Sequence, residues 1–252
     1  MYPIWGRLGS FFVYGYTAVF AAGLLLTWGL THWRAGKTTL PRWPDAALAA
    51  LLTGWVGARL GFLWLNWGYF MERPSELTHL WQGGQTAYGA LSGGLLGLGL
   101  WCWWQKRPFL PTAAFFSPGL LLLITTGWAA CWVEGCAYGQ TTLLGPFSAN
   151  LPDQYGVFAV RTQTQLLGVA LNLLALAVVL LWQKRWGNGR LFPLTLLLAN
   201  LIHLGLTLLR ADPAPHLAGW RLDSWLALLF AIVGLLLLQY GRQKSKQGAR
   251  GK

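Results

Sequence analysis

Residues 162–182, TQTQLLGVALNLLALAVVLLW, decide the fold class of this chain. The stretch carries no charged side chain, and Lys184 and Arg185 follow it after a single glutamine. A helix of about 20 apolar residues crosses the hydrocarbon core of a bilayer, so the stretch predicts a transmembrane helix. Similar stretches along the chain predict about seven spans, at residues 10–30, 46–66, 87–105, 110–137, 162–182, 191–209 and 224–240.

The composition agrees with a membrane protein. The 252 residues are 55% hydrophobic and only 10% charged, which is too apolar for an ordinary soluble domain. We therefore expect one all-α integral membrane domain over residues 1–252, with a disordered basic cytoplasmic tail at 241–252. The first apolar run is expected to stay in the membrane, because more spans follow it.

The net charge of +12 does not indicate nucleic-acid binding, because the basic residues lie in short clusters between apolar runs. The three cysteines, Cys102, Cys131 and Cys136, predict neither a disulfide framework nor a CxxC zinc site.

The distribution of Lys and Arg predicts the orientation. With the N-terminus outside, five arginines lie on the outer side, at positions 7, 73, 161, 210 and 221. Thirteen of the 19 basic residues then flank the spans on the cytoplasmic side. Because cytoplasmic flanks are enriched in Lys and Arg, this bias predicts an N-out, C-in protein.

Unusual polar residues collect toward the outer ends of six predicted spans. Arg59 lies inside a span, roughly 10 Å below its outer end at 1.5 Å per residue. The other members of this layer are Tyr14, Tyr88, Glu134, Arg161, Gln163, Gln165, His203 and Arg210. A charge within a span is costly, and such residues are candidates for function.

Two interpretations of the charged pair stay open. Arg59 could pair with Glu134 and hold two spans together, or bind a lipid phosphate through its planar fork of donors. Glu134 could be that partner, or a base with a raised pKa.

The remaining candidates also have alternative roles. His203 could be a neutral packed side chain or a general base. Tyr14 and Tyr88 could be ordinary interfacial aromatics, and Arg161 and Arg210 could simply lie at the water interface.

Glycines line the second and third predicted spans at helical spacing, at positions 54, 57 and 61 and at positions 89, 93 and 97. Small faces allow close helix contact. The alternative is backbone exposed toward a lipid headgroup.

Several short motifs, in order, resemble the prolipoprotein diacylglyceryl transferase family. They are Val13–Gly15, Gly57–Gly61, Trp81–Gly84 leading into Gly93–Gly94, the segment GWAACWVEGCAYG at 127–139, Arg161 with Thr164–Leu166, and Leu209–Asp212. The resemblance runs along nearly the whole chain, and although no single motif is specific, their order and spacing agree.

The resemblance implies an activity. The family moves a diacylglyceryl group from phosphatidylglycerol to the thiol of a lipobox cysteine in a secreted precursor, at the outer face of the bacterial cytoplasmic membrane. It uses no metal or organic cofactor. The chemistry needs a group that takes up the thiol proton, cations that hold the leaving phosphate, and alignment of both substrates.

The polar layer is expected to supply these groups. Lipid-phosphate binding would fall to Arg59, Arg161, Arg210, Tyr14 and Gln165. The candidate catalytic residues are His203, Glu134 and Tyr88. The expected partners are phosphatidylglycerol or another anionic phospholipid, a lipobox-containing precursor and the membrane itself, and no nucleic acid.

The chain also departs from the family pattern. Tyr88 stands where the family has His, and Trp128 and His203 stand where it has Arg. Cys131 and Glu134 replace two Asn, and Cys136 replaces a Glu. These departures leave an alternative open: a catalytically inactive relative that acts as a lipid-binding or structural subunit of a membrane assembly.

Overall fold

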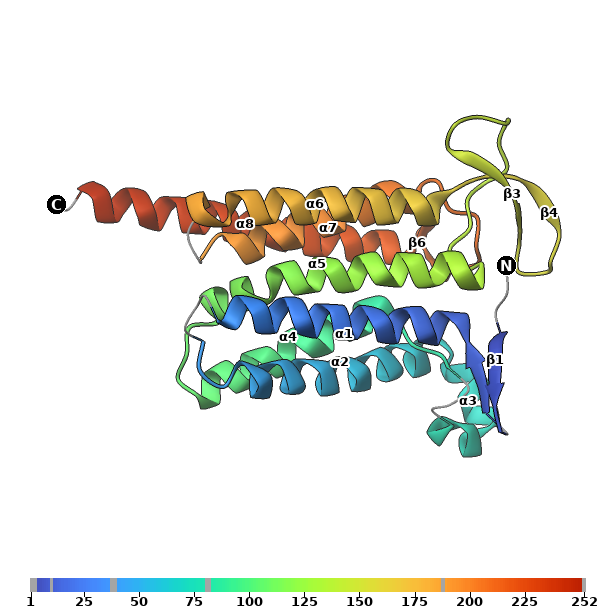
Figure 1. Ribbon diagram of the computed structural model, residues 1–252, viewed down its shortest axis with the longest axis horizontal. Helices are drawn as coiled ribbons and strands as arrows, with labels where there is room; N and C mark the ends of the chain where they lie inside the picture. Colours follow the sequence, from blue (N-terminus) through green and yellow to red (C-terminus); the bar gives the residue numbers. More distant parts are fainter. Residues whose placement is uncertain (1–3, 10, 37–39, 80–82, 187–188, 251–252) are drawn as a thin grey trace. The chain divides into compact units, whose positions relative to one another are not determined.

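The computed structural model describes residues 4–9, 11–36, 40–79, 83–186 and 189–250. Most of them are helical (Figure 1). The helices are α1 (Gly15–Ala35), α2 (Trp43–Leu65), α3 (Trp67–Glu72), the 3-10 helix η1 (Pro74–Thr78), α4 (Ala87–Trp104), α5 (Phe109–Glu134), α6 (Thr164–Trp186), α7 (Leu191–Thr207) and α8 (Leu222–Arg250). Three short hairpins complete the fold: β1 (Ile4–Leu8) with β2 (Phe11–Tyr14), β3 (Ser148–Pro152) with β4 (Phe158–Thr162), and β5 (His216–Leu217) with β6 (Trp220–Arg221).

Each of the predicted spans coincides with one long helix. In the part of the chain that the structure describes, four helical segments are long and apolar enough to cross a membrane, namely Trp43–Leu65, Phe109–Glu134, Thr164–Gln183 and Leu222–Gly241. Helix α7 is apolar but shorter, at 17 residues. The prediction of a helical membrane protein is thus confirmed, while the count of seven spans and the N-out, C-in orientation remain predictions.

The chain divides into two compact units. One comprises residues 38–113, and the other comprises residues 1–37 and 114–252, so that the first turn of α5 belongs to the smaller unit. Whether these two units form a single membrane domain depends on how they are arranged, so the single domain over residues 1–252 stays a prediction.

The smaller unit is built on the contact between α2 and α4. A Cβ atom added at Gly57 would lie 2.5 Å from the carbonyl oxygen of Gly89, and one at Gly93 would collide with the carbonyl of Thr53. The two backbones therefore touch, which only small residues permit. This contact confirms the interpretation of the glycine faces as packing surfaces.

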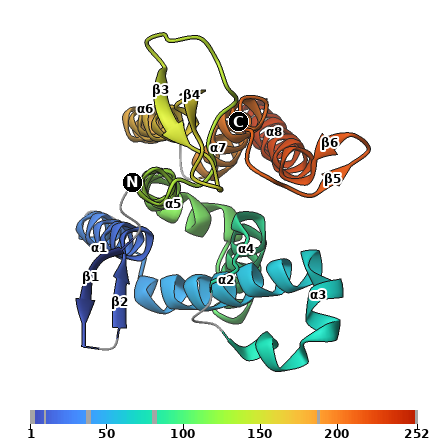
Figure 2. The ribbon, with the colours of Figure 1, turned by 90° about the vertical axis from the view of Figure 1, so that its right-hand side faces the viewer.

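In the larger unit, α1 packs against α5, and α7 packs against both α6 and α8. Near one end of these helices, Arg34 Nη1 donates to Gln183 Oε1 at 2.6 Å and Arg190 Nη2 donates to the carbonyl of Gly241 at 3.2 Å. The hairpin of β3 and β4 extends beyond the opposite end of α6, as the yellow strands in Figure 1 show. Figure 2 shows the β5–β6 hairpin beside α8.

Helix α8 continues to Arg250, past the apolar segment that ends at Gly241. The assignment of residues 241–252 as a basic cytoplasmic tail stays a prediction.

Candidate functional site

A short segment after α5, residues 135–142, organises one end of the larger unit; we call it the junction segment. Helix α5 ends at Glu134, and Gly135 follows with a φ of +90°, a left-handed conformation that glycine adopts without strain. The amides of Gly135 and Cys136 both donate to the carbonyl of Cys131, at 2.8 and 3.0 Å. The chain therefore turns back against the last turn of α5.

This turn brings two cysteines together. Cys131 and Cys136 form a disulfide, with their Cα atoms 4.8 Å apart. The prediction that the cysteines form no disulfide framework is therefore wrong for this pair. A spacing of five residues along a continuous helix does not place two side chains on one face, and only the left-handed turn at Gly135 makes the bond possible. Cys102 is buried in the other unit and is free.

The junction segment links the start of α6 to the end of α7. The amide of Thr162 donates to the carbonyl of Gln140 at 3.0 Å, and the amide of Gln140 donates to that of Leu209 at 2.8 Å. The amide of Ala211 donates to the carbonyl of Tyr138 at 2.9 Å. Arg161 and Arg210 are in this way fixed on either side of one backbone segment.

Arg161 projects from β4 and is buried. Its Nη2 lies 3.1 Å from Asp153 Oδ2, its Nε donates to the carbonyl of Leu151 at 3.3 Å, and its guanidinium carbon lies 5.1 Å from the centre of the Tyr138 ring. Within the described residues, its Nη1 has no hydrogen-bond partner. A guanidinium has five N–H donors, so part of this donor set is available to an anion.

The first residues of α6 are fixed by the same turn. Thr164 Oγ1 donates to the carbonyl of Ala137 at 2.5 Å, and Gln165 Nε2 donates to that of Cys136 at 2.8 Å. Both side chains are fully buried, and the Oε1 of Gln165 has no partner within the described residues. Gln165 is a predicted phosphate ligand and lies four residues after Arg161. In the structure its side-chain amide binds the junction segment at the Cys136 carbonyl.

Arg210 belongs to an ionic cluster with Asp212, Arg221 and Asp223. It forms a two-armed contact with Asp212, with Nε 2.7 Å from Oδ1, and its Nη1 lies 3.2 Å from Asp223 Oδ2. Arg221 contacts the same two carboxylates, at 3.3 and 3.1 Å. Burial disfavours the charged form of Arg221, but the hydrogen bonds and charges of Asp223 and Asp212 outweigh it and raise the pKa of Arg221.

His203 and Trp128 lie beside this cluster. His203 Nε2 is 3.9 Å from Asp223 Oδ2, and its ring centre is 5.8 Å from that of Trp128. Trp128 is buried with Ala137 and Leu206, and the Arg210 guanidinium lies 6.0 Å from its ring centre. The indole of Trp128, on α5, lies against Gly168 of α6 and His203 of α7, and Trp128 stands at the sequence position where the family pattern has Arg.

Arg59 lies in the other unit and is also buried. Its Nη1 donates to the carbonyls of Gly83 and Gly84 at 2.6 and 3.3 Å, and its Nη2 to those of residues 76, 77 and 79 at 3.3 to 3.4 Å. The Cζ atom of Arg59 lies 5.7 Å from the ring centre of Phe62 and 5.7 Å from that of Phe70. Among the described residues of its unit, no carboxylate pairs with Arg59, and the Glu76 carboxylate accepts from the Tyr69 hydroxyl. Its pairing with Glu134 would join the two units and stays a prediction.

The three other predicted site residues lie at helix ends. Tyr14 ends β2 and precedes α1, and its side chain is exposed. Glu134 is the last residue of α5 and is exposed. Tyr88 is in the first turn of α4, in the smaller unit. The structure therefore brings together Arg161, Gln165, His203 and Arg210 around the junction segment.

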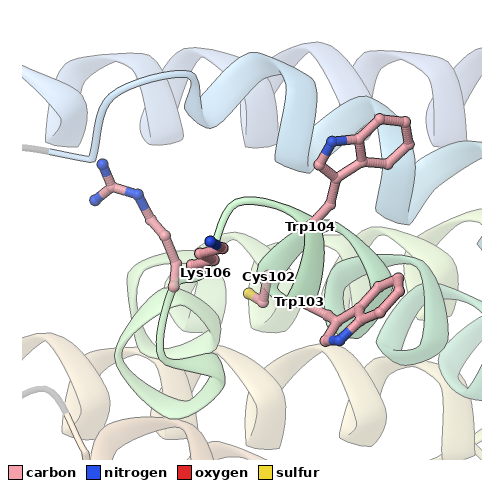
Figure 3. A pocket seen from close by; sticks show the side chains of 5 residues that line it. Cys102, Trp103, Trp104 and Lys106 are labelled. Atoms are coloured by element: carbon pink, nitrogen blue, oxygen red, sulfur yellow. The ribbon is translucent and has the colours of Figure 1, made fainter.

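A hollow lies at the C-terminal end of α4, in the smaller unit, and contains none of the predicted site residues. It is lined by Cys102, Trp103, Trp104, Lys106 and Arg107. Figure 3 shows the two indole rings on one side of Cys102 and Lys106 on the other. Exposed Trp beside Lys and Arg is typical of a membrane interface. Within the described residues, no group of three or more His, Cys, Asp or Glu side chains could hold a metal ion.

Sequence reasoning missed the acidic partners in the larger unit. Asp153, Asp212 and Asp223 each contact an arginine, although they lie in loops or at a helix start. One signal was present: the chain has only seven acidic residues, and four of them, Glu72, Asp153, Asp212 and Asp223, lie within 13 positions of a predicted site arginine.

The chain resembles known proteins over nearly its full length. A family model described as prolipoprotein diacylglyceryl transferase matches residues 3–240. The phosphatidylglycerol–prolipoprotein diacylglyceryl transferase of Cutibacterium acnes is 28% identical, over 94% of this chain and 85% of its own length. Proteins of the same name from Lactobacillus acidophilus and Streptococcus mutans are each 27% identical, over 97% and 96% of this chain and 91% and 95% of their own lengths.

Proposed function

Because this chain belongs to the prolipoprotein diacylglyceryl transferase family, we propose that it transfers the diacylglyceryl group of phosphatidylglycerol to the thiol of a lipobox cysteine. The match of the family model over residues 3–240 carries the proposal, because it extends from β1 through most of α8. No observation on the described residues favours the alternative of an inactive lipid-binding subunit.

The reaction exchanges one bond for another. The acceptor thiolate attacks the diacylglyceryl carbon that bears the phosphate oxygen, so that a C–S bond forms, the C–O bond breaks and glycerol phosphate leaves. The thiol proton passes to a base, because the thiolate is the nucleophile. Negative charge grows on the leaving phosphate, and fixed cations stabilise it.

We assign the leaving phosphate to Arg161 in the larger unit. The support is its burial, its fixed position over Tyr138 and the absence of a partner for its Nη1 within the described residues. Gln165 and Tyr14 remain proposed ligands beside it. Arg210 is a weaker candidate, because Asp212 and Asp223 already neutralise it.

In the smaller unit we assign a phospholipid phosphate to Arg59. Its partners there are neutral carbonyls and two aromatic faces, so its charge has no counter-ion among the residues of that unit that the structure describes. A buried cation without a counter-ion favours the arrival of an anion. The same carbonyl bonds give Arg59 a second role in holding the loop between α3 and α4.

We assign the thiol proton to His203. Uptake of the proton creates an imidazolium, which the Asp223 carboxylate at 3.9 Å stabilises. Glu134 and Tyr88 are the two alternative candidates for the proton acceptor. Substitution of each by a neutral, isosteric residue separates them: His203→Gln should abolish turnover, whereas Glu134→Gln and Tyr88→Phe should retain most of it.

We further propose the bacterial cytoplasmic membrane as the location, with the junction segment on its outer side. The excess of Lys and Arg on the other flanks supports this orientation. So does the Cys131–Cys136 disulfide, because disulfides form and persist in oxidising compartments outside the cytoplasm.

The test uses purified full-length protein in mixed micelles with phosphatidylglycerol and a lipobox peptide. The expected result is a peptide heavier by one diacylglyceryl group, with one glycerol phosphate released per peptide. A second peptide with Ser in place of the lipobox Cys should remain unmodified. Binding of phosphatidylglycerol without any transfer would refute the proposed activity.

A further inference from the structure

The Cys131–Cys136 disulfide occupies the turn on which the proposed site is built. Cys131 lies in the last turn of α5, and Cys136 is the second residue after that helix ends. The bond therefore ties the beginning of the junction segment to a rigid helix. Around this turn, the buried members of the core are Trp128, Ala137 and Leu206.

Each residue after the bond holds one part of the site. The carbonyl of Cys136 accepts from Gln165, and the carbonyl of Ala137 accepts from Thr164, so residues 136 and 137 fix the first turn of α6. The Arg161 guanidinium lies over the Tyr138 ring, and the backbone carbonyl of Tyr138 accepts from the amide of Ala211. A movement of Cys136 would thus displace Arg161 and the start of α6 together.

We propose that this disulfide is a positioning element of the transferase site, so that activity depends on its oxidation. The inference rests on the proposed function and concerns the same site. The two backbone bonds to the Cys131 carbonyl persist when the sulfurs separate, so the turn remains but is no longer locked. The loop that the bond closes is very short, so its effect is local and the fold survives reduction.

The redox step is simple. Reduction breaks the S–S bond and adds two electrons and two protons, which an added dithiol supplies while its own two thiols become a disulfide. The free Cys102 provides a control, because it is buried in the other unit and lies outside the proposed site.

The experiment first establishes the bond. Protein isolated under thiol-blocking conditions is alkylated before and after reduction, and the masses of its peptides are compared. Peptides with Cys131 and Cys136 should react only after reduction. Alkylation of both residues without reduction would overturn the inference.

The kinetic comparison then uses oxidised wild type, dithiol-reduced wild type and the double variant Cys131→Ser/Cys136→Ser, with Cys102→Ser as the control. Loss of the bond should lower kcat/KM by roughly tenfold to a hundredfold, the scale that a misplacement of about 1 Å produces. We expect a lower kcat together with a higher KM for phosphatidylglycerol and an unchanged KM for the peptide, because Arg161 is assigned both the phosphate of the bound lipid and the charge that grows on it. Cys102→Ser should behave as wild type, and the double variant should not respond to dithiol.

A merely structural bond would give a different result. Loss of folded protein lowers kcat and leaves both KM values unchanged, and this outcome would overturn the inference. Amide hydrogen exchange supplies a readout that needs no activity: residues 135–141 and 161–165 should exchange faster after reduction, and α8 should not. Unchanged exchange in both segments would equally count against the proposal.

Failure of the proposed function is distinguishable. If oxidised wild type transfers nothing to the peptide, the transferase assignment fails by itself. Hydrogen exchange and binding of phosphatidylglycerol in nanodiscs then decide the role of the disulfide. Weaker binding after reduction supports it, and equal binding overturns it.

Discussion

The guanidinium of Arg161 lies over the ring of Tyr138, with its Cζ atom 5.1 Å from the ring centre. Tyr138 is buried in the junction segment, whereas Arg161 enters from β4, 23 residues later. The contact is a cation–π interaction, and it fixes the direction of the charge without neutralising it. Asp153 supplies the only carboxylate contact of Arg161 within the described residues.

The first prediction concerns Arg161. Arg161→Ala should remove about 2.7–4 kcal/mol of transition-state stabilisation, the scale of one fixed donor at a developing anion. Arg161→Lys should recover only part of it, because an ammonium lacks the planar fork. The measurement is kcat/KM in mixed micelles. Tyr138→Phe, which keeps the aromatic face, is the matched control and should retain activity; equal activity of wild type and Arg161→Ala would refute the assignment.

The second prediction concerns Arg59. Its replacement by Ala leaves buried carbonyls without donors and should lower the free energy of unfolding by about 3 kcal/mol. Thermal unfolding in detergent measures the loss. Arg73→Ala is the control, because Arg73 is exposed and donates to the exposed side chain of Tyr69, so its loss should leave the midpoint unchanged. A stable Arg59→Ala protein would show that the carbonyls of residues 76, 77, 79, 83 and 84 do not depend on it.

The third prediction concerns the ionic cluster. Arg210 pairs with Asp212 and also with Asp223, and Asp212 pairs also with Arg221. The effects of substituting Arg210 and Asp212 singly should therefore not be additive. A double-mutant cycle with Arg210→Ala and Asp212→Ala should give a coupling energy of about 0.5–3 kcal/mol. Additive effects would contradict the cluster. Activity of the double variant above that of Arg210→Ala would show that the unpaired Asp212, and not the missing charge, inhibits turnover.

The fourth prediction concerns the contact between α2 and α4. Gly57→Leu should destabilise the protein by about 1–3 kcal/mol, because the added side chain must separate two touching backbones. Gly99→Ala lies on the same helix pair, where the nearest atom to the added Cβ is 3.9 Å away, and should be tolerated. Equal unfolding midpoints for the two variants would contradict the close packing.

The fifth prediction concerns orientation. A reporter that works only in the cytoplasm should be active when fused after Lys252, and a reporter that works only outside should be active when inserted after Asp212. The reverse pattern of reporter activity would show that the protein has the opposite orientation in the membrane. It would also place the disulfide in a reducing compartment, so the two observations would then disagree.

The helices were predictable because each predicted span is a long apolar run, and such runs have one stable conformation in a bilayer. Arg59 was a candidate for the same reason, since a charge in an apolar segment stands out. The acidic partners of Arg161 and Arg210 were not predicted. Asp153 and Asp212 lie in polar segments, where a carboxylate attracts no notice until the chain folds back on itself.

The disulfide shows a second limit. Cys131 and Cys136 are five residues apart, and whether they meet depends on one backbone angle, the φ of Gly135. Glycine permits a left-handed turn but does not require it. The prediction from cysteine spacing therefore failed at a position where a single dihedral decides the outcome.

On the proposed topology, six of the seven acidic residues share the outer end with five arginines, and only Asp45 accompanies the 13 basic residues inside. The outer end is therefore close to electrically balanced, and almost the whole surplus of +12 faces the cytoplasmic leaflet. Glycerol phosphate, the anionic product, would meet no surrounding field of positive charge after it leaves Arg161. Its escape into the medium is then opposed by local contacts alone, which favours rapid turnover of the proposed site.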